Sequence, residues 1–452
     1  MSLLTEIENA GVVGAGGAGF PTQTKLNATA EYFIINAAEC EPLLKNDHYV
    51  MDNHAKEVVQ AILMVKNLLQ AEHAVIATKN YYTREIRSLE NAISEANADI
   101  ELHLMENFYP AGDEQVMVYE VTGRVVPPGG IPLMVGCVVS NVTTMFNVYQ
   151  AAAEQKPVTR KQMTVTGEVG APTLLDVPIG TPFDKCLEAA GGTPLSNYLF
   201  IDGGPMMGKI FDQDELGDKV VTKTTSGLIV KEDSGYLSKL KHQTLEQIFT
   251  LAKSVCMQCT LCTQMCPRQN LGHPVFPHKT MRYFGGSPTY DNIDYNDVSA
   301  EILRNAQICS ECGICEVIAC PMGLSPRQVN KHVKSELAKL GVKYHTEQTE
   351  FIPDPMRDFR GVAPKNILIK MGLTQYADYT LTEMKILQTD EVFIPLSMHI
   401  GAPSVPVVKE GDWVEEGSLI AAKPEKALGA NIHASITGKV VKVTGQLIHI
   451  KK

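Results

Sequence analysis

Two short cysteine runs constrain this chain more than any other feature of its sequence. Eight of its 11 cysteines lie in them. The first run contains Cys256, Cys259, Cys262 and Cys266, and the second contains Cys309, Cys312, Cys315 and Cys320. Three thiolates at this spacing can bind three irons of a [4Fe–4S] cube, and a fourth ligand must come from elsewhere. The runs therefore predict two [4Fe–4S] clusters.

The last cysteine of each run is expected to serve the cluster of the other run, as in two-cluster ferredoxins. We predict one cluster bound by Cys256, Cys259, Cys262 and Cys320, and the other by Cys309, Cys312, Cys315 and Cys266. Each run ends in Cys-Pro, which turns the chain away from the cluster. Four residues separate Cys315 from Cys320, whereas the usual spacing, found between Cys262 and Cys266, is three.

Other interpretations of the cysteines are possible. Zinc sites favour two cysteine pairs separated by a longer spacer, but here a third cysteine follows each pair after only two residues. A disulfide framework requires an oxidising compartment and is typical of small secreted chains. Buried structural cysteines would not gather in this way. Iron therefore explains the spacing better than these alternatives.

Length and charge limit the class of protein. A chain of 452 residues predicts about three domains. The net charge of -11 and the lack of a Lys/Arg-rich arm argue against a nucleic acid partner. The first residues do not resemble a signal peptide, and no apolar run is long enough to span a membrane. We expect a protein of a reducing compartment, the cytoplasm, without a transmembrane segment.

A glycine-rich segment near the start is the second chemical signal. It contains Gly14, Gly16, Gly17 and Gly19, followed by Phe20 and Pro21. Such a backbone can approach a ligand closely and direct N–H groups at phosphate. It matches G-x-G-x-x-G, but residues 6–13 make a poor strand, which a dinucleotide fingerprint requires. A structural turn is the alternative.

Strands and helices alternate in the first 150 residues, which predicts a parallel sheet flanked by helices. The expected strands are 32–36, 74–78, 100–104 and 138–144. The expected helices are 53–70, 85–98, and a stretch that residues 109–115 enter and that ends at Thr122. Polar residues from Asn36 to Glu41 follow the first strand, where open α/β sheets bind ligands. Asp113 and Glu114 stand at a helix start, where a simple helix cap is an equally good interpretation.

Four segments resemble the flavin-binding subunit of respiratory NADH dehydrogenase, and they occur in the same order as in that family. They are Gly14 to Lys25, Asn36-x2-Glu39-x-Glu41-Pro42, Gly112-Asp113-Glu114, and Ser140-Asn141-Val142-x-Thr144. Ala38 stands where the family has Asp, and Ser140 where it has Asn. The resemblance implies that this part of the chain binds FMN and NADH.

The same resemblance implies roles for individual residues. The glycine loop and Lys25 would hold the FMN phosphate and ring, while Glu41 and Glu114 would lie near the nicotinamide, with Phe20 available for stacking. The full set of implied cofactor-binding residues is Gly14, Gly16, Gly17, Ala18, Gly19, Phe20, Lys25, Asn36, Glu39, Glu41, Gly112, Asp113, Glu114, Asn141 and Thr143. No catalytic side chain is implied, because the cofactors carry the chemistry.

The predicted fold class is α/β multidomain. We expect a Rossmann-like flavin domain at 1–152, an SLBB-like β-grasp domain at 153–235, a helical two-[4Fe–4S] ferredoxin-like domain at 236–345, a connector at 346–390, and a barrel-sandwich module at 391–452. The last module resembles biotinyl and lipoyl carriers but lacks their modified lysine hairpin, which favours a docking or structural role.

The order of the modules resembles the soluble cobalamin reductases of propanediol utilisation. That resemblance implies an NADH-dependent enzyme that reduces cobalamin, works beside a corrinoid adenosyltransferase, and resides in the cytoplasm or in a bacterial microcompartment with its shell proteins. One alternative is an Rnf-like C subunit that exchanges electrons with membrane partners. Another is a non-enzymatic electron-transfer scaffold with a vestigial flavin pocket.

Overall fold

The computed structural model describes residues 1–286, 293–294 and 301–452. These residues form two compact units. The first unit comprises residues 1–106, 136–233 and 376–452, and the second comprises 107–135 and 234–375. Residues 287–292 and 295–300, part of the predicted ferredoxin-like domain, lie outside the described residues. Each unit has a hydrophobic core of its own.

A four-stranded parallel sheet begins the first unit. Its strands, in the order β3-β2-β1-β4, are β3 Glu101–Met105, β2 His73–Lys79, β1 Tyr32–Ala37 and β4 Cys137–Asn141. Phe33, Ile34 and Ile35 of β1 are fully buried, as expected for a central strand covered on both faces. The predicted strand at 138–144 is too long, because the Asn141 side chain caps a helix by accepting the N–H of Thr144.

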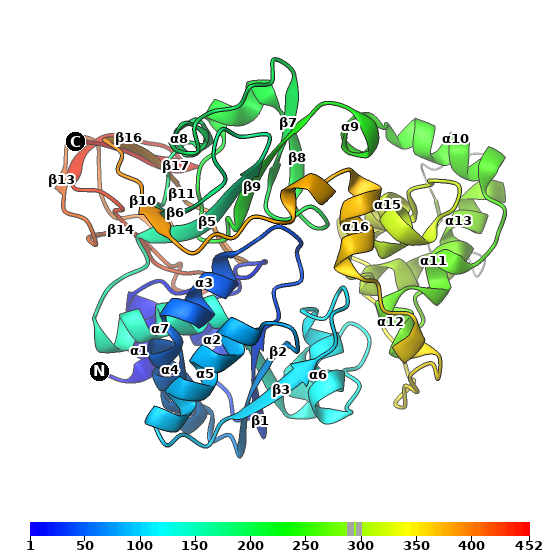
Figure 1. Cartoon of the computed structure of the whole chain (residues 1–452), viewed down its shortest axis with the longest axis horizontal. Helices are drawn as coiled ribbons and strands as arrows, with labels where there is room; N and C mark the ends of the chain where they lie inside the picture. The colour runs from blue at the N-terminus through cyan, green and yellow to red at the C-terminus, as the bar shows by residue number, and fades with distance from the viewer. Residues whose placement is uncertain (287–292, 295–300) are drawn as a thin grey trace. The chain divides into compact units, whose positions relative to one another are not determined.

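Helices surround this sheet, and their apolar faces form its core. They are α1 Leu3–Asn9, α2 Thr22–Leu26, α3 Asn46–Asn53, α4 Ala55–Leu69, α5 Thr83–Glu95 and α7 Val142–Ala153. The long helix α4 contacts α5, α7 and strand β2 (Figure 1). The glycine-rich segment lies between α1 and α2, so a helix and not a strand precedes it.

A six-stranded mixed sheet follows, in the order β10-β6-β5-β9-β7-β8. Its elements are β5 Arg160–Gly167, β6 Thr173–Pro178, α8 Phe183–Ala189, β7 Tyr198–Asp202, β8 Lys209–Asp212, the 3-10 helix η2 Gln213–Asp218, β9 Gly227–Glu232 and β10 Met384–Ile386. The edge strand β10 pairs in parallel with β6. The predicted connector therefore adds a strand to the β-grasp sheet, which its sequence did not indicate.

The chain ends in a small all-β module built from two sheets, β11-β17-β16-β13 and β12-β14-β15. Its strands are β11 Glu391–Pro395, β12 Val405–Pro406, β13 Trp413–Val414, β14 Leu419–Ala422, β15 Ile432–His433, β16 Gly438–Val443 and β17 Leu447–Lys451. Val392, Ile394, Ile448 and Ile450 are fully buried in its core, as the alternation of apolar residues requires.

The second unit is helical. It contains α6 Glu114–Thr122, η1 Pro132–Val135, α9 Gly235–His242, α10 Leu245–Val255, α11 Leu261–Gln264, α12 Pro267–Asn270, α13 Pro277–Gly286, α14 Glu301–Arg304, η4 Asn305–Ile308, a π-helix at Cys315–Ala319, α15 Pro326–Lys339, η6 Arg357–Phe359 and α16 Pro364–Met371. Buried side chains of α10, α13 and α15 form its main core. In the described ranges, no helix is long and apolar enough to cross a bilayer. The predicted multidomain α/β fold class is confirmed.

Candidate functional site

The two cysteine runs adopt the same backbone pattern. In each run, the residue two places after the first cysteine has a positive φ: 57° at Gln258 and 59° at Glu311. The residue after the second cysteine does too: 67° at Thr260 and 84° at Gly313. These left-handed residues coil the chain tightly around the cysteines. The two runs are therefore structural repeats as well as sequence repeats.

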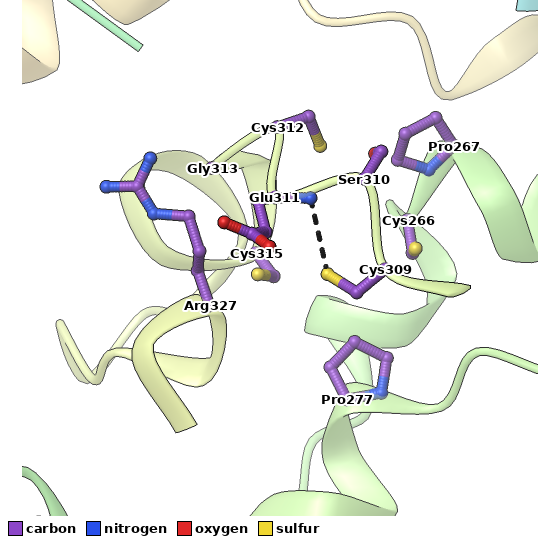
Figure 2. Close-up of a pocket in the computed structure, with 10 residues that line it drawn as sticks. All are labelled: Cys266, Pro267, Pro277, Cys309, Ser310, Glu311, Cys312, Gly313, Cys315 and Arg327. Atoms are coloured by element: carbon purple, nitrogen blue, oxygen red, sulfur yellow. Dashed lines mark hydrogen bonds between the residues drawn. The ribbon is translucent and has the colours of Figure 1, made fainter. Parts of the chain in front are cut away.

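One cysteine quartet lines a pocket in the second unit (Figure 2). Cys309, Cys312 and Cys315 of the second run meet Cys266 of the first run there. The other lining residues are Pro267, Pro277, Ser310, Glu311, Gly313 and Arg327. Cys266, Cys312 and Cys315 are buried, and Cys309 is half-buried. The structure thus brings together the four cysteines that were predicted to share the second cluster.

The other quartet is also assembled. The thiols of Cys256, Cys259 and Cys320 lie close enough to Cys262 to act on its titration. Cys259 is exposed, and the other three are half-buried. Cys320 therefore lies among the cysteines of the first run, although it ends the second.

A π-helix explains the unusual spacing of the second run. The extra residue between Cys315 and Cys320 is taken up by the π-helix Cys315–Ala319, whereas the first run forms a short α-helix at the same place. A π-turn accommodates one more residue per turn than an α-helix does, and such turns are frequent at functional sites. Cys320 consequently leaves the turn at the position that Cys266 occupies in the first run.

The cysteine quartets suit a cationic group. Burial, followed by repulsion from neighbouring cysteines, raises the pKa of Cys262 to about 12. Burial and repulsion also raise the pKa of Cys266 and of Cys315 above the usual range of a thiol. Thiolates in these positions need nearby positive charge, and the irons of a cube supply it. The chemistry of the two donor sets therefore fits two [4Fe–4S] clusters.

An ion pair and a tyrosine support the second quartet. Arg327, which lines the pocket, pairs with Glu316 at 2.6 Å, and Glu316 is only 1% exposed. The hydroxyl of the buried Tyr109 donates to the carbonyl oxygen of Cys312 at 2.7 Å. Lys334 donates to the carbonyl oxygen of Cys309. Tyr109 and Lys334 thus hold the backbone of the run at Cys312 and Cys309, and Arg327 balances the charge of the buried Glu316.

The segment 107–135 belongs to the second unit and carries three of the predicted nucleotide-binding residues. The structure places Asp113 at the start of α6, where its carboxylate accepts the N–H groups of Gln115 and Val116. The same carboxylate pairs with Arg268 at 2.9 Å. Glu114 is the first residue of α6, and Gly112 precedes the cap. Asp113 therefore caps α6.

The glycine loop of the first unit is an exposed turn that packs closely against Asn141. Gly16, Gly17 and Ala18 are exposed. A Cβ atom at Gly16 would lie 2.9 Å from the amide of Asn141, so this position has room only for glycine. Gly14 and Phe20 close the loop through the Gly14 N–H, which bonds the carbonyl oxygen of Phe20. The exposed turn thus runs directly beside Asn141.

Asn141 and Thr143 meet a carboxylate that the sequence did not single out. Asn141 Nδ2 and Thr143 Oγ1 each donate to Asp47 at 2.7 Å. Asp47 is buried in the first turn of α3. Lys161 of β5 is also buried, and its ammonium donates to the carbonyl oxygen of Ala15 in the glycine loop. Residues from three other segments therefore gather beside this loop.

The segment after β1 is held by side chains of neighbouring elements. Asn36 Oδ1 accepts the N–H of Ala38, and the Glu39 carbonyl oxygen accepts hydrogen bonds from Lys79 and Tyr82. Burial, with repulsion from Asp47 next, raises the pKa of Glu39 to about 8. Lys25 donates to the carbonyl oxygen of Val139.

Glu41 is bound by a loop of the β-grasp domain. Its two carboxylate oxygens accept the N–H groups of Met206 and Met207 at 2.9 and 2.8 Å. A Cβ atom at Gly204 would lie within 2.5 Å of this carboxylate, which explains the glycine. The residue that was predicted to lie near the nicotinamide is thus positioned by the second domain of the unit.

Comparison with known protein families finds matches to four parts of the chain. Four family descriptions match: a Nuo51 FMN-binding domain at residues 7–150, an SLBB domain at 162–209, a 4Fe-4S dicluster domain at 255–325, and an RnfC barrel sandwich hybrid domain at 375–452. Each description corresponds to a module that the structure contains.

Two curated relatives match nearly the whole chain. Cobalamin reductase PduS of Citrobacter freundii is 40% identical over 98% of this chain and 95% of its own length. Cobalamin reductase PduS of Salmonella typhimurium is 39% identical over the same shares. The chain belongs to the cobalamin reductase PduS family. A more distant relative, the C subunit of an ion-translocating oxidoreductase complex from Erwinia tasmaniensis, is 33% identical over 59% of this chain and 32% of its own length.

For this PduS family member, the site residues fall into two groups. One group is the pair of cysteine quartets in the second unit, which can hold clusters that transfer single electrons. The other is the glycine loop with Asn141 and Thr143 in the first unit, which offers backbone and side-chain hydrogen-bonding groups to a flavin. Sequence reasoning missed Asp47 and Lys161, because both reach the site from distant segments without a local motif.

Proposed function

We propose that this protein is an NADH-dependent cobalamin reductase. A bound flavin accepts a hydride and releases single electrons, and [4Fe–4S] clusters transfer electrons one at a time. Cobalt is reduced in single-electron steps, so a chain with both kinds of site suits a corrinoid acceptor. The observation that carries the proposal is the presence of two assembled cysteine quartets in a chain with a flavin-binding family domain.

The residues have distinct tasks in this proposal. FMN is bound by the glycine loop and Lys25. It is oriented by Asn36, Asn141 and Thr143. NADH is contacted by Glu41. The two quartets hold two [4Fe–4S] clusters. The cysteines need no acid or base near them, because single-electron transfer moves no proton at the ligands. A corrinoid adenosyltransferase is the partner that would consume the reduced cobalamin, and a microcompartment with its shell proteins is the location that suits this pairing.

Purified protein, prepared without oxygen, tests the proposal directly. We expect NADH to drive the formation of cob(II)alamin or cob(I)alamin, which is measured by visible absorption spectroscopy. The variant Cys262→Ser should lose this activity, whereas Cys186→Ser, outside both quartets, should keep it. Rapid reduction of another acceptor, with no reduction of cobalamin by the parent protein, would contradict the proposal.

The relative from the ion-translocating complex supports a second candidate, an Rnf-like electron-transfer protein. That relative shares 33% identity with a little over half of this chain. The second candidate predicts stable co-purification with integral membrane proteins from native cells. The cobalamin reductase proposal predicts a protein that reduces cobalamin without them.

A further inference from the structure

Asp47 organises the side chains beside the glycine loop. Its Oδ1 accepts a hydrogen bond from the Thr143 hydroxyl, and its Oδ2 accepts one from the Asn141 amide, both at 2.7 Å. The Asn141 Oδ1 accepts the backbone N–H of Thr144. The Asn141 amide is therefore held at both ends, and its orientation is fixed.

This arrangement determines what the two side chains offer a ligand. Because the proton of the Thr143 hydroxyl is directed at Asp47, its oxygen can act toward a ligand only as an acceptor. Asn141 has a second N–H, which can act as a donor. The pyrimidine edge of a flavin carries an N–H donor between two carbonyl acceptors. An acceptor and a donor side by side are complementary to that edge.

Lys161 brings a positive charge to the same place. Its ammonium donates to the Ala15 carbonyl oxygen at 3.0 Å, and the Ala15 N–H donates to Thr144 Oγ1 at 2.9 Å. Both backbone groups of Ala15 are thus held. Burial lowers the pKa of Lys161 to about 8, while the negative charge of the nearby Asp47 opposes that shift and favours the ammonium form.

The positive charge of Lys161 would matter when a bound flavin receives a hydride. A flavin bound here would gain two electrons and one proton from a hydride, and would therefore carry one additional negative charge that the Lys161 ammonium could offset. A buried cation stabilises that charge more strongly than an exposed one, because the local dielectric constant is low.

We propose that Asp47 and Lys161 complete the flavin site of this protein. Asp47 is a positioning residue that sets Thr143 as an acceptor and Asn141 as a donor for the pyrimidine edge, and Lys161 stabilises the negative charge that arrives with the hydride. The inference rests on the proposed function, since it requires a flavin in the first unit. It adds residues of α3 and of the β-grasp strand β5 to a site that the resemblance builds from other segments.

A second buried lysine provides a matched control. Lys223 donates to the carbonyl oxygens of Gly11 and Asn431, and burial lowers its pKa to about 7. It resembles Lys161 in burial and in its backbone partners. Its charge is not accompanied by the Asp47, Asn141 and Thr143 network. Lys161→Met and Lys223→Met therefore both remove a buried ammonium, but only the first removes it from the proposed site.

The test is the midpoint potential and the dissociation constant of flavin bound to the whole protein, measured without NADH or cobalamin. We expect Lys161→Met to shift the flavin potential to a more negative value and Lys223→Met to leave it unchanged. Asp47→Asn should weaken FMN binding about tenfold, because a hydrogen bond to a charged acceptor is lost. An alternative outcome is that Lys161→Met folds but binds no flavin, while Lys223→Met binds it. That result would also support the inference, because Lys161 would then contribute to the affinity of the site for flavin.

Equal flavin potentials and FMN affinities for the parent protein, Lys161→Met and Asp47→Asn would overturn the inference. That result would leave the proposed function untouched, because cobalamin reduction is measured separately. A parent protein that binds no flavin at all would instead defeat the proposed function and the inference with it. A flavoprotein that does not reduce cobalamin would contradict only the proposed function.

Discussion

The two cysteine quartets begin from nearly the same sequence and end in different surroundings. Cys259 of the first quartet is exposed, whereas three cysteines of the second quartet are buried in a pocket that Arg327 also lines. The coil of the chain is the same in both, with left-handed residues at matching positions. The motif therefore sets the local path of the backbone, and the packing around it sets the environment of the cluster.

This difference suggests a division of labour. A cluster near solvent can exchange electrons with a partner outside the protein, whereas an enclosed one is shielded and its potential is set by nearby charges and hydrogen bonds. The second quartet has such neighbours in Arg327, Lys334 and Tyr109. We interpret the first quartet as the more accessible electron carrier and the second as the internal one.

The largest expected effect is the loss of a whole cluster. Cys320→Ser should remove the same four irons as Cys259→Ser, and Cys266→Ser the same four as Cys312→Ser, because the last cysteines cross between runs. Iron analysis and electron paramagnetic resonance of the remaining cluster measure this. Cys186→Ser, a cysteine outside both quartets, should retain all the iron. A Cys320→Ser variant whose remaining signal matches that of Cys312→Ser would refute the crossed assignment.

Breaking the buried ion pair should have the next largest effect. Arg327→Met leaves the 1%-exposed Glu316 without its counter-charge, which is expected to lower the free energy of unfolding by about 3–5 kcal/mol. The control is Lys339→Met, whose pair with Glu336 in the same unit is exposed and is worth below about 1 kcal/mol. Chemical denaturation of both variants compares them. Similar losses would show that the enclosed surroundings of the second quartet do not matter for stability.

A buried histidine should make the second unit sensitive to acid. His273 bonds the carbonyl oxygen of Val126, and burial, with repulsion from Arg268, lowers its pKa to about 4. An unfolded histidine titrates near pH 6.5, so the unfolded chain binds more protons between pH 6.5 and 4. Stability should therefore fall as the pH falls through this window, by up to about 3 kcal/mol.

Urea denaturation between pH 7 and pH 5 tests this prediction. His273→Gln should flatten the acid limb of the stability curve, whereas His345→Gln, at an exposed position, should leave it unchanged. An unaltered acid limb in His273→Gln would mean that other groups destabilise the unit in acid.

The smallest expected effect concerns the left-handed residue that follows the second cysteine in each run. Thr260 has a φ of 67° and Gly313 a φ of 84° at equivalent positions. A β-branched residue is strained there by about 1–2 kcal/mol, whereas glycine is not. Thr260→Gly should therefore raise the thermal midpoint slightly, and Gly313→Ala should lower it. A lower thermal midpoint for Thr260→Gly, or a higher one for Gly313→Ala, would show that the two runs are not equivalent.

The sequence predicted what local patterns encode. Cysteine spacing, apolar strands and glycine turns indicated the modules, the strands of the parallel sheet and the character of the sites. It did not predict β10, because its three residues pair with a distant edge strand. It did not predict Asp47 or Lys161, since their roles depend on which segments the fold brings together. The π-helix after Cys315 was visible only as an unusual spacing, whose geometric meaning required the backbone.

The most direct test of the proposed electron path is an anaerobic titration of the whole protein with NADH, followed by visible absorption. We expect bleaching of a flavin band together with loss of cluster absorbance, in proportion to the NADH added, and the return of both when cobalamin is supplied. Clusters that stay oxidised in a protein with no flavin band would contradict a path from NADH through this chain. The protein would then be an electron relay or scaffold.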